Sequence, residues 1–409
     1  MAAALTFEYK GRDGSGKAVK GRMEAQTEAA VVTRLKTMGV APIGIQEVGA
    51  GTGLNAEITI PGFEKQVGLK DLAIMSRQMS TMISAGLSLL QTLNILAEQT
   101  ENKKLAKTLN QVRNDVETGV SLSDAMYKHQ IVFPPIMVNL VRAGEVGGFL
   151  EKAMDSVAVN FEKEVKLKNT VKAAMTYPVV VLIISILAVI GMLIFIVPVF
   201  EKMFADLGSE LPPPTQFLVW LSKVMVWLGP VLIVAAIGFS VWWRRNKNTE
   251  RVRAFIDPIK LKLPVFGSLM TKIAIARFTR NFSTMIGAGV PILRSLAIVG
   301  ETSGNFVIER ALLKVQESVR TGQSIAKPLA LEPVFPAMVT QMIAVGEDAG
   351  ALEQMLEKIA DFYDDEVQAM TEQLTALIEP LMIVFLGSVV GGMIVALYMP
   401  IFSIIGEVK

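Results

Sequence analysis

Acidic residues recur at matching places in the two halves of this 409-residue chain. Glu151 and Asp155 are four residues apart, so a helix would place both carboxylates on one face. Glu98 is the third acid of the set, and the second half repeats it as Glu301, Glu353 and Glu357. Like charges on one helix face repel, by roughly a few tenths of a kcal/mol per pair, so a counter-charge is expected.

Two kinds of counter-charge remain open for these acids. The first is a basic side chain that lies nearby in sequence or opens a repeat, and the candidates are Lys152, Arg142, Arg77 and Arg280. The second is a hard cation such as Ca²⁺, which prefers carboxylate and carbonyl oxygens. Glu98, Glu151 and Asp155 are therefore a candidate metal site, although three acids alone underfill the roughly 6–8 ligands that Ca²⁺ takes.

The rest of the sequence gives little support for catalysis. There is no Cys, so disulfides and thiolate chemistry are excluded, and His129 is the single histidine. The segment from Gly11 to Lys17 is similar to a phosphate-binding loop, but Ala18 stands where that loop needs Ser or Thr to hold Mg²⁺. The residues that follow are typical of a strand, which favours a hairpin turn. We therefore predict no enzymatic activity.

Glu379 is a candidate of another kind, because it lies just inside the last apolar run of the chain. A carboxylate at the edge of a bilayer marks a functional site by default, although it can also extend to the headgroups. Gly387 and Gly391 have the small-residue spacing that lets membrane helices approach closely. This spacing favours helix packing within or between subunits.

Three uncharged runs account for the hydrophobic content of 51%, and they cover residues 173–200, 224–243 and 381–406. Each reaches the roughly 20 apolar residues that a helix needs to span a bilayer. We therefore predict three spans, at residues 173–200, 215–243 and 377–405. The N-terminal ten residues lack the apolar core of a signal peptide, so we expect none to be cleaved.

The chain also contains an internal repeat. Residues 77–87 (RQMSTMISAGL) and 280–290 (RNFSTMIGAGV) are identical at seven of eleven positions, at an offset of 203. AGEVGGFLE (143–151) matches VGEDAGALE (345–353) at an offset of 202. Each copy is a polar helical part followed by one span. Breaks at Gly86 and at Gly289 predict several short helices, followed by a long helix that begins near Gly148 in the first copy and runs into the span. Since both copies should have the same orientation, the second span must return the chain across the membrane.

Basic residues predict which side each part faces. Lysines precede the first span and a basic segment follows the second, whereas residues 201–214 carry only Lys202. By the positive-inside rule, the N-terminus and both helical parts should be cytoplasmic, and residues 201–214 and the C-terminus should face outward. A net charge of +2 lacks the strong basic excess that is typical of nucleic-acid-binding proteins, so we expect no nucleic-acid partner.

The predicted fold is mostly α, a polytopic membrane protein with two repeated cytoplasmic helical-bundle domains and three transmembrane helices. A small N-terminal ββαβ module is expected over residues 1–50, where strand-like runs flank the turn-rich GRDGSG. The other predicted segments are a linker (51–68), the first helical domain (69–172), the first span (173–200), an outer loop (201–214), the second span (215–243), a basic linker (244–268), the second helical domain (269–376) and the third span (377–405).

These motifs resemble those of the PilC/GspF family, the platform proteins of type IV pilus and type II secretion machines. The resemblance rests on STMISAGL and STMIGAGV, the Gly-Glu-x-x-Gly turns at 144–148 and 346–350, TYP before the first span, and LIEPLMIVFLG with LYMPIF in the last. It covers essentially the whole chain. It implies an inner-membrane platform that couples a hexameric cytoplasmic ATPase to the extraction and polymerisation of pilin or pseudopilin subunits.

The resemblance also implies partners and a metal. The expected partners are the ATPase, pilin or pseudopilin subunits, other inner-membrane alignment proteins, the lipid bilayer and further copies of the chain. Residues 1–50 and the helical domains offer the large cytoplasmic surfaces, so the ATPase should dock there. Members of the family have a Ca²⁺ site in the first cytoplasmic domain, and Glu98, Glu151 and Asp155 look like the matching positions.

Two rival functions remain open on the sequence alone. A small transporter or channel could be built from two parallel repeats, but three spans without a charged mid-membrane cluster argue against it. A membrane-bound ATPase would rest only on the near match at Gly11 to Lys17. A flux assay in liposomes and a nucleotide-binding assay would separate these rivals from the platform.

Overall fold

The structure is a computed structural model of the chain. It describes residues 5–12, 18–25, 28–38, 41–48, 66–206, 211–247, 249–264 and 266–407. The chain divides into two compact units, Met1–Gln66 and Val67–Lys409. The predicted linker 51–68 falls outside the described residues except for its last three.

The described part of the N-terminal unit contains three strands and one helix in the order β1 (Leu5–Arg12), β2 (Ala18–Ala25), α1 (Glu28–Thr37) and β3 (Ala41–Val48). The strands form an antiparallel sheet in the order β2-β1-β3. Gly11 pairs with Val19 and Arg12 pairs with Ala18, so the near match to a phosphate-binding loop is a hairpin, as the sequence favours. Its turn, residues 13–17, lies outside the described residues. Ala18 begins a strand, so the helix N-terminus that would hold a phosphate does not follow it.

Each repeat opens with a bundle of short helices. In the first copy these are α2 (Leu69–Ser84), α3 (Leu89–Gln99), α4 (Lys103–Glu117), α5 (Leu122–Tyr127) and α6 (Pro135–Gly147). In the second copy they are α11 (Phe266–Gly287), α12 (Ile292–Thr302), α13 (Phe306–Arg320), α14 (Ala326–Ala330) and α15 (Ala337–Asp348). Gly86 and Gly289 have φ of 85° and 72° in equivalent turns, a left-handed conformation that glycine adopts without strain. Asn102 and Asn305 are equivalent N-caps, and each accepts two backbone N–H groups of the helix that follows.

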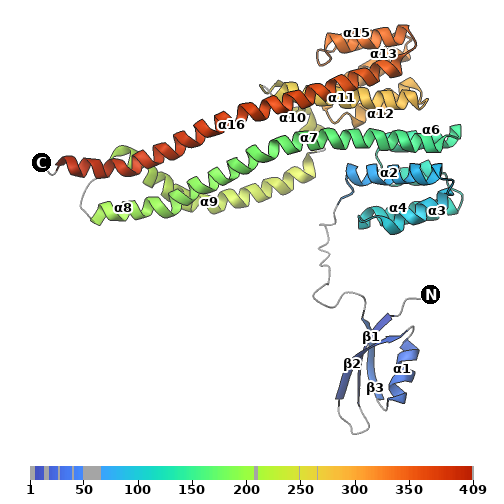
Figure 1. Ribbon diagram of the computed structural model, residues 1–409, viewed down its shortest axis with the longest axis horizontal. Helices are drawn as coiled ribbons and strands as arrows, with labels where there is room; N and C mark the ends of the chain where they lie inside the picture. Colours follow the sequence, from blue (N-terminus) through green and yellow to red (C-terminus); the bar gives the residue numbers. More distant parts are fainter. Residues whose placement is uncertain are drawn as a thin grey trace. The chain divides into compact units, whose positions relative to one another are not determined.

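One hydrophobic core runs through both bundles. Its largest buried side chains include Phe133 and Phe161 of the first copy and Phe278 and Phe282 of the second. The long helix α16 (Leu352–Glu407) packs against α11 of its own copy and against α7 (Leu150–Gly191) of the first. The two helical domains therefore form one packed body within the second unit (Figure 1).

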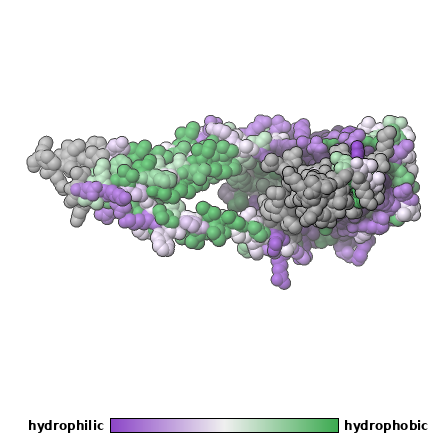
Figure 2. All heavy atoms as spheres, turned by 90° about the horizontal axis from the view of Figure 1, so that it is seen from below, coloured by the Kyte–Doolittle hydropathy of each residue, from purple (hydrophilic) through white to green (hydrophobic). Residues whose placement is uncertain are grey.

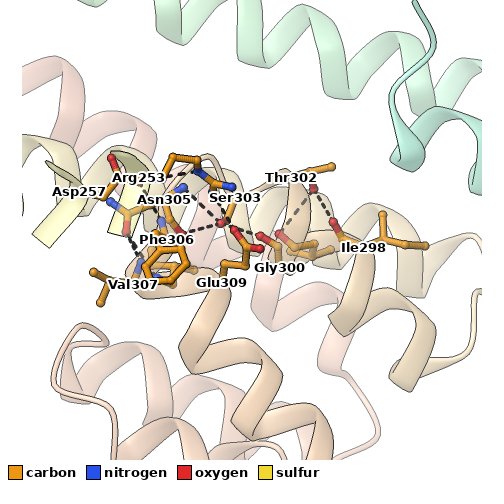
Figure 3. Close-up of polar contacts among 12 residues, drawn as sticks. Arg253, Asp257, Ile298, Gly300, Thr302, Ser303, Asn305, Phe306, Val307 and Glu309 are labelled. Carbon is orange, nitrogen blue, oxygen red and sulfur yellow. Dashed lines mark hydrogen bonds and ion pairs between the residues drawn. The ribbon is translucent and has the colours of Figure 1, made fainter. Parts of the chain in front are cut away.

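The predicted basic linker 244–268 differs from the structure, because α10 (Glu250–Lys262) occupies its middle and α11 begins at Phe266. Asp257 explains the difference. Its side chain is 5% exposed, and it accepts the backbone N–H of Phe306 at 3.0 Å at the start of α13. Arg253 pairs with Glu309 at 2.7 Å. Figure 3 shows these contacts, which fix α10 to the second helical domain and override the helix-breaking tendency of Pro258.

Three helical segments of the described chain are long and apolar enough to cross a membrane. α7 continues through a π-helical turn, η1 (Met192–Ile196), into α8 (Val197–Asp206), the second segment is α9 (Pro213–Asn246), and the third is the C-terminal part of α16. Both α7 and α16 run as continuous helices from the helical domain into the apolar segment, as predicted (Figure 1). The predicted outer loop 201–214 is helical as far as Asp206, the last residue of α8. Within this helical part, Glu201 forms an ion pair with Lys223 of α9 at 2.7 Å.

The three apolar segments pack together at the end that is distant from the helical domains. Their buried contacts there are made by Leu193, Val197, Leu218, Val219, Met393, Ala396 and Leu397. Toward the helical domains α9 instead exposes apolar side chains, including Val231, Ile233 and Val234. Figure 2 shows the resulting apolar surface over the spans and the polar surface of the helical domains.

Candidate functional site

An arginine of the first copy lies between two carboxylates of α7. Arg77, on α2, donates from Nε and Nη2 to the two oxygens of Glu162, both at 2.8 Å, and it also pairs with Asp155. The hydrogen bonds from Arg77 hold the pKa of Glu162 below its usual value, and burial opposes this effect. They also raise the pKa of Arg77. A two-pronged guanidinium contact of this kind fixes geometry as well as charge, so it holds α2 in register with α7.

The second copy repeats this clamp with Arg280 on α11. Its Nη2 lies 2.6 Å from Asp364, which is the counterpart of Glu162, and 2.9 Å from Asp361. Burial raises the pKa of Asp364, although the charge of Arg280 opposes this. Burial also acts to raise the pKa of Asp361, but hydrogen bonds from Lys163 and Arg280 outweigh it and lower that pKa. Lys163 comes from α7, 3.2 Å from Asp361, so this charge network joins the two copies.

A buried amide lies at the centre of the junction between the copies. Asn160, on α7 and only 2% exposed, donates to Asn281 at 3.0 Å and to Thr284 at 3.1 Å. Beside it Arg277 pairs with Glu164 at 2.9 Å. Polar contacts of this kind make a junction depend on geometry, because a buried polar group that loses its partner is costly.

The acids predicted as a metal site are not brought together. Asp155 pairs with Arg77, which was one of the basic partners considered, and Glu98 accepts a hydrogen bond from Asn94 at 2.9 Å. The carboxylate of Glu151 is exposed, and its backbone carbonyl accepts from Ser80 at 3.5 Å. Across the described residues, no three acidic or histidine side chains form a cation-binding group.

Calcium binding at Glu98, Glu151 and Asp155 stays a prediction. Calorimetric titration of the full-length protein with Ca²⁺, repeated with Asp155→Asn, would test it.

The glutamates of the two Gly-Glu-x-x-Gly turns have a structural task that sequence analysis missed. Glu347 accepts the backbone N–H of Ile325 at 2.9 Å and that of Ala326 at 3.3 Å, at the start of α14. In the first copy Glu145 accepts the equivalent N–H groups of Leu122 and Ser123. The sequence carried a signal for this, because Glu145 recurs as Glu347 at an offset of 202, and the capped positions 122 and 123 recur as 325 and 326 at an offset of 203. These glutamates cap a helix of their own copy.

Glu379, Gly387 and Gly391 lie on the membrane-spanning part of α16, as predicted. Glu379 is exposed and has no partner among the described residues. A Cβ atom added at Gly387 or Gly391 would meet nothing within 4 Å, so among the described residues the close approach that this spacing permits is not made. The surface is open for contact with another molecule.

These features define a class of protein: a membrane protein built from two copies of a helical domain, each continued by one helix into a span. The family model for type II secretion system protein F matches residues 75–198 and again residues 278–400. The model for the N-terminal domain of that protein matches residues 1–46. The chain belongs to this family, as its motifs predict.

Characterised relatives cover nearly the whole chain. The type IV pilus assembly protein PilC of Myxococcus xanthus is 44% identical over 409 residues, which is 100% of this chain and 97% of that protein. The protein of the same name from Thermus thermophilus is 43% identical, covering 98% of this chain and 99% of the relative. The type II secretion system protein F of Vibrio cholerae is 30% identical, covering 97% and 98%.

Proposed function

We propose that this protein is the inner-membrane platform of a type IV pilus assembly machine. The relatives named for pilus or fimbrial assembly are 33–44% identical, whereas those named for type II secretion are 30% identical. This difference favours a pilus over a secretion filament. The basic residues before the first span and after the second support cytoplasmic helical domains, a cytoplasmic N-terminus and an outward C-terminus.

The observation that carries the mechanism is the continuity of α7 and α16. A continuous helix can transmit rotation or tilt from a cytoplasmic domain to its span, and neither helix has a proline between its helical domain and its predicted span. Pro178 of α7 and Pro380 of α16 each remove one backbone hydrogen bond, but both lie inside the span. The spans are held together at the far end, whereas α9 exposes its apolar side chains toward the helical domains. Movement of the helical domains would therefore open or close the spans on the cytoplasmic side. There an apolar pilin segment could be drawn from the bilayer.

An ATPase would supply that movement. We propose that it contacts the cytoplasmic helical domains and the N-terminal unit. Deleting residues 1–50 should leave the protein inserted but weaken its co-purification with the ATPase. Undiminished co-purification would exclude the N-terminal unit as the docking element.

The coupling role is tested by a break in α7 between domain and span. Asn169 is exposed, and proline there removes a helix hydrogen bond and kinks the helix, at a cost of roughly 3 kcal/mol or more. Asn169→Pro should abolish pilus assembly in the native host while the protein remains in the membrane at its normal level. Asn169→Ala is the matched control and should assemble pili normally. Normal piliation with Asn169→Pro would refute mechanical coupling through α7.

A further inference from the structure

A groove of about 570 Å³ lies between α7 and α11, at the level where α7 enters its apolar run. Its floor is apolar and includes Leu167, Val171, Met175 and Ile273. The floor continues onto Val179, which is 46% exposed on the membrane-spanning part of α7. The groove thus joins the surface of the helical domains to the surface that faces lipid acyl chains.

The rim of this groove carries unpaired positive charge. Lys168 and Lys172 are exposed and one turn apart on α7, and neither amino group has a partner among the described residues. Other lysines nearby are neutralised, since Lys163 pairs with Asp361 and Lys272 pairs with Glu366. Two like charges at this spacing repel each other on a helix, so an anion between them would be favoured.

Arg277 lines the same groove and also carries a donor that lacks an acceptor among the described residues. Its Nη2 pairs with Glu164 at 2.9 Å, but its Nε is buried without a hydrogen-bond partner. The lining thus carries three positive groups, namely Arg277, Lys168 and Lys172, against the single carboxylate of Glu164. The groove has an excess of two positive charges, three minus one.

The internal repeat shows that the fold does not require this charge. At the offset of 202, Lys168 and Lys172 correspond to Met370 and Leu374 in the second copy. Leu374 is 4% exposed and packs in an apolar cluster with Leu269 and Val367. The same helix position is therefore an apolar contact in one copy and an exposed basic pair in the other. A requirement of the helical domain would appear in both.

We propose that this groove binds an anionic phospholipid, with its phosphate between Lys168 and Lys172 and an acyl chain along the apolar floor. Lipid matches the site better than a soluble anion does, because the floor is apolar and continues onto the span. A basic cluster on the cytoplasmic side of a membrane helix attracts anionic headgroups. A bound lipid would brace α7 against α11 at the point where helical domain and span meet.

The experiment is native mass spectrometry of the full-length protein after delipidation in detergent. Phosphatidylglycerol and phosphatidylcholine with identical acyl chains are titrated in parallel, and inorganic phosphate is the soluble-anion arm. The wild type should bind phosphatidylglycerol roughly ten-fold more tightly than phosphatidylcholine, since each lysine near an anionic headgroup contributes several-fold. Inorganic phosphate should not displace the lipid.

The double variant Lys168→Gln/Lys172→Gln should lose most of this preference. Lys152→Gln/Lys166→Gln, which removes two exposed lysines of the same helix that do not line this groove, should keep it. Equal affinity for the two lipids, or an unchanged preference in Lys168→Gln/Lys172→Gln, would overturn the proposal. So would displacement by inorganic phosphate, or a photo-crosslinker at Met175 that captures a protein helix in place of lipid.

Discussion

Glu347 offers the sharpest test of how each repeat is held together. Its carboxylate accepts the N–H groups of Ile325 and Ala326, and Ile325 is only 1% exposed. In Glu347→Ala the backbone N–H of Ile325 would lose its carboxylate acceptor. A hydrogen bond to a charged group contributes about 1.5–3 kcal/mol, so the loss should be about 2 kcal/mol. Glu347→Gln keeps one acceptor oxygen without the charge and should lose about half as much.

Thermal unfolding of the purified protein in detergent measures this loss. A change of about 2 kcal/mol lowers the Tm by roughly 4–8 °C for a cooperative unit of about 150–250 residues. The neighbouring Asp348 is exposed and has no partner among the described residues, so Asp348→Ala is the matched control and should leave the Tm unchanged. Since Glu145 makes the equivalent contacts in the other copy without sharing a partner, the losses in Glu145→Ala/Glu347→Ala should add.

The capping argument would fail on either of two results. The first is a Tm for Glu347→Ala that equals that of Asp348→Ala. The second is a double variant that is no less stable than Glu347→Ala alone, since two independent caps must add.

Three further predictions follow from the structure. Gly346→Ala should destabilise the protein by about 1–3 kcal/mol, because its Cβ would lie 2.9 Å from Met355; a Tm equal to the wild type would contradict the tight contact of α15 with α16. Glu379→Gln should stop pilus growth at a normal protein level if this carboxylate meets a partner, and normal pili would mean that it only reaches the headgroups. The pKa of Glu162 is depressed by its hydrogen bonds with Arg77, so this contact stabilises the folded state at neutral pH and is lost in acid. The Tm difference between wild type and Glu162→Gln should therefore be present at pH 7 and shrink as the pH falls below the ordinary value of 4.5; a difference independent of pH would contradict the ion pair.

Much of the fold follows from local sequence signals. The uncharged runs predict the spans, and the glycines at 86 and 289 predict helix ends, because a left-handed turn and a bilayer both impose requirements on single residues or short segments. The repeat then supplied the equivalence of the two halves, which the family model confirms at residues 75–198 and 278–400. The continuity of α7 from domain to span also followed, since no breaker separates Leu150 from the first apolar run.

Contacts between distant segments could not be read in the same way. The segment of α10 was predicted as a linker from its basic residues alone, and its folding as a helix depends on the contact of Asp257 with α13. Asp155 and Arg77 are 78 residues apart, so spacing gave Arg77 only as one candidate among several. The clamp between Arg77 and Glu162 was missed, although its recurrence as Arg280 and Asp364 was visible in the repeat.

Comparing the two copies distinguishes positions that recur in both, which the helical bundle requires, from positions that differ between them. The arginine clamp and the glutamate cap occur in both copies. So does the glycine that packs against the long helix, which is Gly144 in the first copy and Gly346 in the second. These features therefore maintain the helical bundle. Asn160 has Phe362 as its counterpart, and Lys168 has Met370. These positions lie at the junction of the copies and where α7 enters its span. A duplicated domain that keeps its core while changing these surfaces has become asymmetric where it meets its twin and the membrane. The two copies therefore present different surfaces at their junction and where α7 enters its span, and this is the asymmetry that the proposed platform would use.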